Sequence, residues 1–250
     1  MKHIEYGNCS NIGMVRTENQ DSYGVFPDGS VGDPDVKGRL FVIADGMGGH
    51  RGGKQASSIA VNTMNEVYFS SADNDVKSRL LQAAQRANDR INEYTINHPD
   101  LFGMGTTLTA MVVTDTGCIA HVGDSRIYRV TADTIEQLTK DHSKVAEMQR
   151  RGILTAQEAR QHPDRSQLYR ALGTRPKVEV DIAAIPLNVN EYFVMCTDGL
   201  HNLVEPEEIR DIVLSHTPGE AAETLVNLAN ERGGHDNITV QIIRVREAEA

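Results

Sequence analysis

Five aspartates in this 250-residue chain stand beside small or polar residues at the ends of short apolar segments. They are Asp21, Asp45, Asp124, Asp198 and Asp236. Asp-Gly and Gly-Asp pairs are common in turns, so any one of these aspartates taken alone is best interpreted as a turn residue. Five carboxylates gathered at one place would form a site for hard ions, because oxygen ligands select Mg²⁺ or Mn²⁺ over Zn²⁺.

The chemistry of such a site would be hydrolysis of a phosphoryl group. Crowded carboxylates raise one another's pKa unless cations neutralise them. Two divalent ions about 3.5–4 Å apart can bridge and acidify one water for in-line attack on phosphorus. The chain carries 25 Lys and Arg against 35 Asp and Glu, a net charge of −10, so a phosphorylated substrate also needs local cations to approach.

Arg16, five residues before Asp21, is the best-placed candidate to hold the phosphate. Its planar guanidinium can bond two phosphate oxygens at once. Without the neighbouring aspartate, a surface salt bridge would be the simpler interpretation of this arginine.

The apolar segments decide whether the aspartates can meet. Asp45 and Asp198 follow such segments, Asp21 and Asp236 precede them, and Asp124 lies in a hairpin between two. If neighbouring strands are antiparallel, all five carboxylates share one end of the sheets. The segments are rich in β-branched residues and predict strands at 22–27, 39–44, 106–114, 117–122, 126–131, 191–197 and 237–245.

Helical spacing of apolar residues predicts two successive helices around 56–68 and 76–94, and two more at 205–215 and 218–232. Strands in runs and helices in pairs favour antiparallel sheets covered by helices, an α+β or layered α/β architecture, and disfavour a Rossmann-like fold. Short turns predict a meander over 106–131.

Residues 140–177 carry nine Lys or Arg against four acidic residues. This segment is either a solvated insertion of short helices or a mobile flap that meets an anionic partner. Length alone leaves one or two domains open.

The acidic balance disfavours nucleic acid and membrane surfaces as partners. The three cysteines, Cys9, Cys118 and Cys196, fit reduced thiols. We see no signal peptide and no apolar run of membrane-spanning length, so we expect a cytoplasmic protein.

Six short strings extend in order from residue 13 to residue 239. They are Gly13-Met14-Val15-Arg16 with Asn19-Gln20-Asp21, Ala44-Asp45-Gly46-Met47-Gly48-Gly49-His50, Met104-Gly105-Thr106-Thr107, His121-Val122-Gly123-Asp124-Ser125-Arg126, Cys196-Thr197-Asp198-Gly199-Leu200, and Asp236-Asn237-Ile238-Thr239. Taken together, these strings resemble the metal-dependent protein phosphatase family, the type 2C serine/threonine phosphatases, and most closely its compact bacterial members.

The resemblance implies an α+β fold in which two antiparallel β-sheets pack as a sandwich flanked by pairs of antiparallel α-helices. It implies a single catalytic domain over residues 1–250, with the flap at about 140–177. The implied activity is hydrolysis of phosphoserine and phosphothreonine by a metal-bridging water or hydroxide. The enzyme would act as a monomer in signalling, on phosphorylated proteins, and oppose a serine/threonine kinase.

The resemblance also implies roles for the candidate residues. Asp45 would bridge two core Mn²⁺ or Mg²⁺ ions, Gly46 would lend its carbonyl to one, and Asp198 and Asp236 would complete the other. Asp21 would act on the first ion through water. Asp124 with Asp198 would hold a third, weaker ion, and Arg16 would clamp the substrate phosphate.

The sequence departs from eukaryotic members at two positions. Met47 stands where they place a histidine that protonates the leaving group, which leaves His50 or a metal-bound water as the general acid. Gln20 replaces an acidic residue. Two alternative functions stay open: a pseudophosphatase that binds phosphoproteins without turnover, and a phosphatase of small metabolites.

Overall fold

The computed structural model describes residues 2–27, 37–47, 49–155, 158–159 and 162–247. Within them, the strands form two five-stranded sheets and a two-stranded ribbon, and every strand pair is antiparallel. The Rossmann-like alternative is thereby excluded, since that fold needs parallel strands.

The first sheet has the order β1 (Lys2–Asn11), β12 (Ile238–Glu247), β11 (Tyr192–Cys196), β8 (Arg126–Val130) and β9 (Ile135–Gln137). The second has the order β10 (Asp181–Ile185), β7 (Gly117–Val122), β6 (Leu108–Val113), β3 (Arg39–Ala44) and β2 (Ser22–Phe26). The ribbon pairs β4 (Gly46–Met47) with β5 (Gly105–Thr106).

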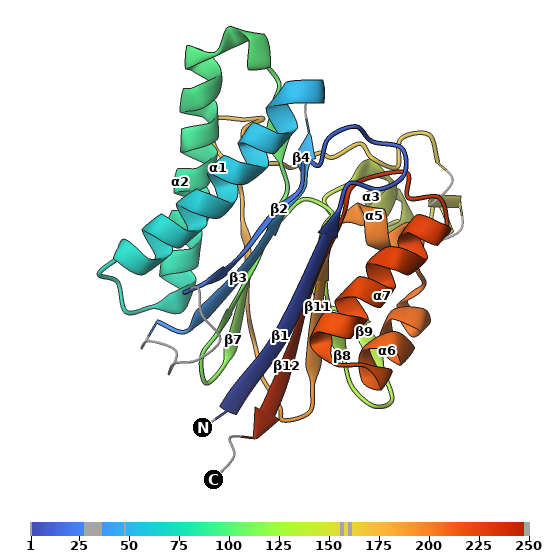
Figure 1. Cartoon of the computed structure of the whole chain (residues 1–250). Coiled ribbons are helices and arrows are strands. Elements are labelled where there is room, and N and C mark those ends of the chain that lie inside the picture. The colour runs from blue at the N-terminus through green and yellow to red at the C-terminus, as the bar shows by residue number, and fades with distance from the viewer. Residues whose placement is uncertain (1, 28–36, 48, 156–157, 160–161, 248–250) are drawn as a thin grey trace.

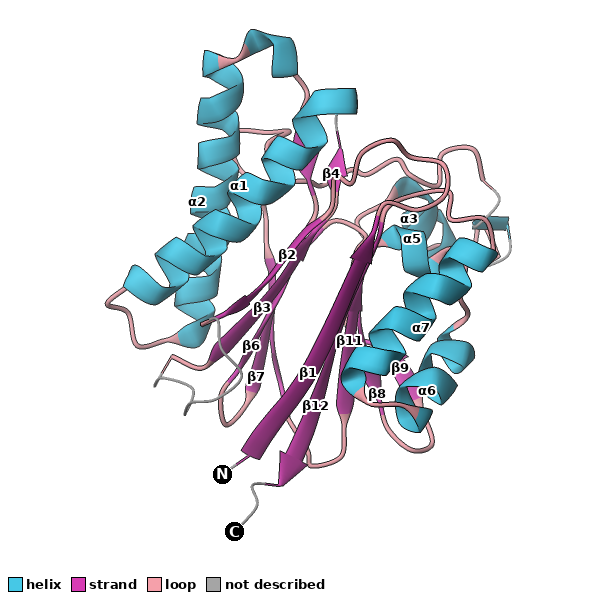
Figure 2. Cartoon of the chain, in the orientation of Figure 1, coloured by secondary structure: helices cyan, strands magenta, loops and turns pink. Residues whose placement is uncertain are grey.

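Helices cover the outer face of each sheet, as Figures 1 and 2 show. The second sheet carries α1 (Gly49–Ser70) and α2 (Val76–Asn97), and the first carries α5 (Asp198–His201), α6 (Pro206–Ser215) and α7 (Pro218–Glu231). A short η1 (Pro99–Leu101) follows α2, and α3 (Lys144–Arg150) lies beyond the ends of the sheets.

The sandwich core follows from the two-residue alternation of β-strands. On β3, Leu40 and Val42 pack against α1 and α2, whereas Phe41 and Ile43 pack against residues of the opposite sheet, such as Phe193. All five side chains are fully buried. The predicted α+β sandwich with paired flanking helices is confirmed.

Local signals fix where the flanking helices begin. The Asp75 carboxylate accepts a hydrogen bond from the Ser78 amide at the start of α2. Thr217 and Glu220 form a reciprocal capping box at the start of α7, whose first residue is Pro218. Such caps satisfy amides that have no partner within the helix.

One prediction about strands was wrong, and the strands β1, β9 and β10 were not predicted. The chain over 106–131 is not one meander, because β7 and β8 belong to different sheets and residues 123–125 carry the chain from one sheet to the other. Gly123 adopts a φ of 114°, which only glycine adopts freely, and this allows the sharp change of direction. The edge strand β1 was missed, because its polar sequence lacks an apolar run.

The described part of the basic segment 140–177 is held to the sheets at several points. An isolated bridge joins Leu172 to Thr106 of β5, and Arg126 of β8 donates to the Asp141 carboxylate at 2.7 Å. A second bridge, between Ser143 and Leu168, lies within the segment itself. Asp141 and His142 are buried, so the segment is more than a solvated insertion. None of the helices in the described ranges has both the length and the apolar character needed to cross a membrane.

Candidate metal centre

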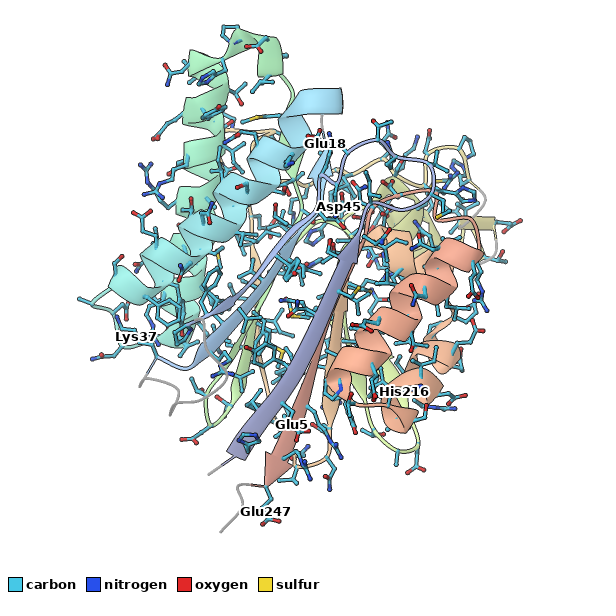
Figure 3. All side chains as sticks on the ribbon, viewed as in Figure 1. Glu5, Glu18, Lys37, Asp45, His216 and Glu247 are labelled. Atoms are coloured by element: carbon cyan, nitrogen blue, oxygen red, sulfur yellow. The ribbon has the colours of Figure 1, made fainter. Side chains whose placement is uncertain are left out.

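A cleft of about 560 Å³ opens at the end of the sandwich opposite the two termini, where Asp45 and Glu18 lie in Figure 3. Four of the predicted aspartates line it: Asp45, Asp124, Asp198 and Asp236. The other described lining residues are Val15, Arg16, Thr17, Glu18, Gln20, Gly46, Met47, Thr107, Ser166, Leu168, His235 and Asn237.

Asp45 is placed by the end of β3. Its amide donates to the Thr107 hydroxyl at 2.9 Å, and its carbonyl accepts from the Thr107 amide, also at 2.9 Å. The Thr107 hydroxyl continues to Ser125 at 2.8 Å. Gly46 follows in β4, where a Cβ would lie 2.2 Å from the Gly53 carbonyl oxygen, so only glycine fits.

Asp21 lies beneath the cleft, directly before β2. One carboxylate oxygen accepts from the hydroxyls of Thr239 at 2.6 Å and Thr197 at 3.0 Å. The other oxygen is buried and has no hydrogen-bond partner. Burial is the main cause that raises the pKa of Asp21 to about 7, and the nearby charges of Asp198 and Asp236 add to it.

Asp198 is the first residue of α5, directly after the β11 strand and Thr197. One of its oxygens is buried without a partner. Its other oxygen accepts a hydrogen bond from the Asn202 side chain at 3.2 Å. Burial, followed by the charge of Asp236, raises the pKa of Asp198 to about 6.

Asp124 lies in the connection between β7 and β8 and is buried. Burial raises its pKa well above the usual value, and Asp198 contributes through charge repulsion. The same two causes, burial first and then the neighbouring aspartates, raise the pKa of Asp45. The carboxylates therefore cannot all be ionised together without a compensating cation.

The donor set fits hard divalent ions. The partnerless, buried oxygens of Asp21 and Asp198 are the observation that supports this fit, since buried polar atoms normally find a partner. Among the described residues, no three His, Cys, Asp or Glu side chains form a ready-made ligand set for one ion. Mg²⁺ and Mn²⁺ fit such a site, because Mg²⁺ in particular binds through one or two carboxylates and keeps several waters.

Arg16 and Asp236 meet at the mouth of the cleft. The guanidinium donates to Asp236 at 2.7 Å, and this hydrogen bond is the main cause that raises the arginine pKa. More than half of the Arg16 side chain is exposed. Its neighbours Met14 and Val15 are 69% and 62% exposed, so an unusually apolar surface adjoins the candidate phosphate ligand.

Sequence reasoning assigned no role to the residues that support the aspartates. Asn237 is the clearest: its side chain accepts from the Gln20 amide and donates to the carbonyls of Ile12 and Glu18. Thr107 supports Asp45, and Thr197 and Thr239 support Asp21. All four residues lie in the strings that resemble the phosphatase family, and that position was the only signal for them.

The two positions at which the sequence departs from eukaryotic family members, Gln20 and Met47, both line the cleft. Both therefore lie where a metal-bound water or a leaving group could contact them. The candidate general acid His50 belongs to α1, and its side chain lies outside the described residues. His235 lines the cleft and is exposed.

Comparisons with known proteins agree with this geometry. The family model of protein phosphatase 2C matches residues 16–237. The chain is 38% identical to the serine/threonine phosphatase stp of Listeria innocua, over 96% of this chain and 95% of the relative. It is 34% identical to the protein phosphatase PhpP of Streptococcus pneumoniae, over 99% and 100%.

Solved structures show the same fold. The serine/threonine phosphatase PstP/Ppp of Mycobacterium tuberculosis superposes with a TM-score of 0.87 at 32% identity, covering 98% of this chain and 99% of that one. A PstP catalytic domain in complex with two manganese ions gives 0.87 at 31% identity, covering 99% and 100%.

The fold and the carboxylate-lined cleft define a metal-dependent phosphoprotein phosphatase. The chain belongs to the protein phosphatase 2C family, and it is a protein serine/threonine phosphatase that depends on Mn²⁺ or Mg²⁺.

Proposed function

We propose that the aspartate-lined cleft is the active site at which this enzyme removes phosphate from phosphoserine and phosphothreonine. The observation that carries the assignment is the meeting of Asp45, Asp124, Asp198 and Asp236 in one cleft, with Asp21 buried beneath it. An acidic cluster of this kind is stable near neutral pH only when protons or divalent cations compensate its charge.

In this proposal Asp45, the Gly46 carbonyl, Asp198 and Asp236 would hold two core ions, and Asp45 would serve both. Asp124 and Asp198 would hold a third ion, and Asp21 would act on the first through water. Bound there, Mn²⁺ or Mg²⁺ would supply an acidified water and neutralise charge on the phosphate.

Arg16 then orients the substrate. In the metal-free arrangement its guanidinium is engaged by Asp236 at 2.7 Å. Asp236 engaged as a metal ligand would hold Arg16 less tightly, and the planar fork of the arginine would then be available for two phosphate oxygens. The exposed Met14 and Val15 beside it provide an apolar surface for the polypeptide that carries the phosphate.

We propose that residues 1–250 form one catalytic domain, with 140–177 as its flap. Ser166 and Leu168, from this segment, line the same cleft as Asp45. The flap thus supplies part of the wall against which a substrate would lie, and its excess of Lys and Arg suits an anionic partner.

We further propose that the enzyme acts as a cytoplasmic monomer in signalling and opposes a serine/threonine kinase. The three free cysteines support the cytoplasmic placement, because they suit a reducing compartment.

A direct assay tests the activity at this site. Mn²⁺ should produce turnover of p-nitrophenyl phosphate that EDTA abolishes, and phosphoserine or phosphothreonine peptides should be better substrates than sugar phosphates. Fully metallated protein without turnover would favour a pseudophosphatase, and a strong preference for sugar phosphates would contradict the protein substrate.

A further inference from the structure

Two buried histidines hold the turn that carries Asp124. The Gly123 amide donates to Nδ1 of His142 at 3.0 Å, and the His142 amide donates to the Gly123 carbonyl at 2.7 Å. One residue later, Nε2 of His201 lies 3.0 Å from the Asp124 carbonyl oxygen. His142 and His201 are only 3% and 6% exposed.

The two histidines come from different parts of the chain. His142 lies in the flap, between β9 and α3. His201 is in α5, the helix whose first residue is Asp198. The turn of Asp124 is therefore bonded both to the flap and to the helix that carries a second candidate ligand of the third ion.

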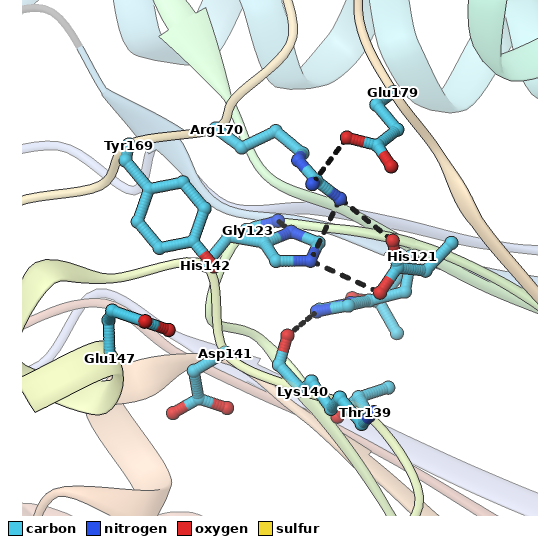
Figure 4. A network of polar contacts seen from close by, with 12 residues as sticks. His121, Gly123, Thr139, Lys140, Asp141, His142, Glu147, Tyr169, Arg170 and Glu179 are labelled. Atoms are coloured by element: carbon cyan, nitrogen blue, oxygen red, sulfur yellow. Dashed lines mark hydrogen bonds and ion pairs between the residues drawn. The ribbon is translucent and has the colours of Figure 1, made fainter. Parts of the chain in front are cut away.

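The outer nitrogen of His142 reaches an ion-pair cluster, which Figure 4 shows. Nε2 lies 3.3 Å from Asp181 Oδ2 and 3.1 Å from the Arg170 guanidinium. Arg170 bonds the other oxygen of Asp181 at 2.7 Å and also bonds Glu179 at 2.7 Å. This cluster fixes the plane of the ring, so Nδ1 stays directed at the Gly123 amide.

The hydrogen-bond partners give the two rings opposite roles. Because the Gly123 N–H is a donor, Nδ1 of His142 must accept, and the ring proton is on Nε2. Because the Asp124 carbonyl is an acceptor, Nε2 of His201 must donate. Burial lowers the pKa of both histidines, that of His201 to about 3, so both rings are neutral near pH 7.

We infer that His142 and His201 are positioning residues that hold Asp124 at the distance from Asp198 that the third cation requires. This inference rests on the proposed function, in which those two aspartates bind that ion. The histidines act through the backbone of the turn, as groups behind metal ligands commonly do. Loss of either bond would let Asp124 move and would weaken the ion that is held least tightly.

Asparagine and glutamine distinguish this role from simple packing. The side-chain oxygen of asparagine can take the place of Nδ1, and the side-chain nitrogen of glutamine can take the place of Nε2. At position 142 asparagine therefore keeps the bond to the turn and glutamine loses it. At position 201 the order is reversed: glutamine keeps the bond and asparagine loses it.

The test is Mn²⁺ binding to the full chain, followed by electron paramagnetic resonance of the free ion. His142→Gln and His201→Asn should weaken the weakest Mn²⁺ site by roughly 10- to 100-fold, the usual effect of losing a group behind a metal ligand. His142→Asn and His201→Gln should bind Mn²⁺ as the wild type does, and the two tighter sites should be unchanged in all four variants.

Asp124→Asn separates the inference from the proposed function. If Asp124→Asn leaves all Mn²⁺ binding intact, the third-ion assignment fails. Suppose instead that Asp124→Asn removes the weakest Mn²⁺ site. If the asparagine and glutamine variants of each histidine then bind Mn²⁺ at that site with equal affinity, the positioning role fails. Thermal unfolding in EDTA shows whether each variant is folded, and loss of the weakest site in folded His142→Asn or His201→Gln also contradicts the inference.

Discussion

Asp45 and Asp198 show at the level of single residues how the metal-free cleft balances its charge. Burial raises the pKa of both carboxyl groups, and the charges of neighbouring aspartates raise it further. A proton on such a group offsets the repulsion that a divalent ion would remove in the working enzyme. A neutral amide at either position can form hydrogen bonds but offers no negative charge to a cation.

Asp45→Asn or Asp198→Asn should therefore lower kcat by several orders of magnitude, because the water nucleophile loses its activation. Steady-state turnover of a phosphopeptide in Mn²⁺ measures this. Asp211→Asn, at an exposed position of α6, is the matched control and should keep full activity. Near-normal turnover in Asp198→Asn would refute the proposed site.

Arg16→Ala should mainly raise KM, because the guanidinium binds the phosphate and does not activate the water. Hydrogen bonds to charged groups contribute about 1.5–3 kcal/mol, so KM should increase roughly 10- to 100-fold. Arg16→Lys keeps the charge without the planar fork, so its KM should lie between those of the wild type and Arg16→Ala. An unchanged KM with a much lower kcat in Arg16→Ala would contradict this role.

At the level of elements, the backbone of strand β4 packs directly against the backbone of helix α1, with no side chain between them at Gly46 and Gly53. A Cβ on Gly46 would lie 2.2 Å from the Gly53 carbonyl oxygen and 2.6 Å from that of Gln20. In the proposed site, this contact would fix the Gly46 carbonyl that is offered to the first ion.

Gly46→Ala should destabilise the protein by about 1–3 kcal/mol, the usual cost of overpacking, and should weaken Mn²⁺ binding. Thermal unfolding in EDTA and an Mn²⁺ titration measure the two effects. Gly219→Ala is the control: nothing lies within 4 Å of its added Cβ, and it is in the first turn of α7. An alanine there should be neutral or slightly stabilising, and equal stability of both variants would refute the close contact.

For the whole molecule, the buried acidic cluster links stability to pH and metal. The pKa of Asp21, about 7, and that of Asp198, about 6, exceed the value of about 3.9 expected in an unfolded chain. Their contribution to the metal-free fold is complete below pH 4 and is lost as the pH rises through 6 and 7. Protons and cations compete for the same oxygens.

The increase in Tm that Mn²⁺ produces should therefore grow between pH 5 and pH 8, as the carboxylates lose their protons. Comparing unfolding in EDTA with unfolding in saturating Mn²⁺ at each pH measures it. The buried His121 and His201, with lowered pKa values of about 4 and about 3, destabilise both forms at low pH, so their effect cancels in this difference. An equal increase at pH 5 and pH 8 would contradict the linkage.

The residue pattern by itself predicted antiparallel sheets covered by helices, because β-branched runs and helical spacing report burial directly. The packing of two such sheets into a sandwich came from the family resemblance. Strands such as β3 and β7 were predicted with their observed limits, 39–44 and 117–122. The polar strand β1 was missed, since its stability comes from pairing with β12 and not from its own sequence. The turn after β7 was misassigned because sequence does not show in which sheet the next strand lies.

The same distinction holds for the cleft. The sequence determined which residues could bind metal, since only carboxylates beside strand ends combine charge with a fixed place on a rim. The tertiary structure decided what surrounds them: the threonine hydroxyls on Asp21, the burial that raises the pKa of Asp45 and Asp198, and the histidines behind Asp124. Those contacts join segments far apart in the chain, and their geometry exists only once both sheets are packed together.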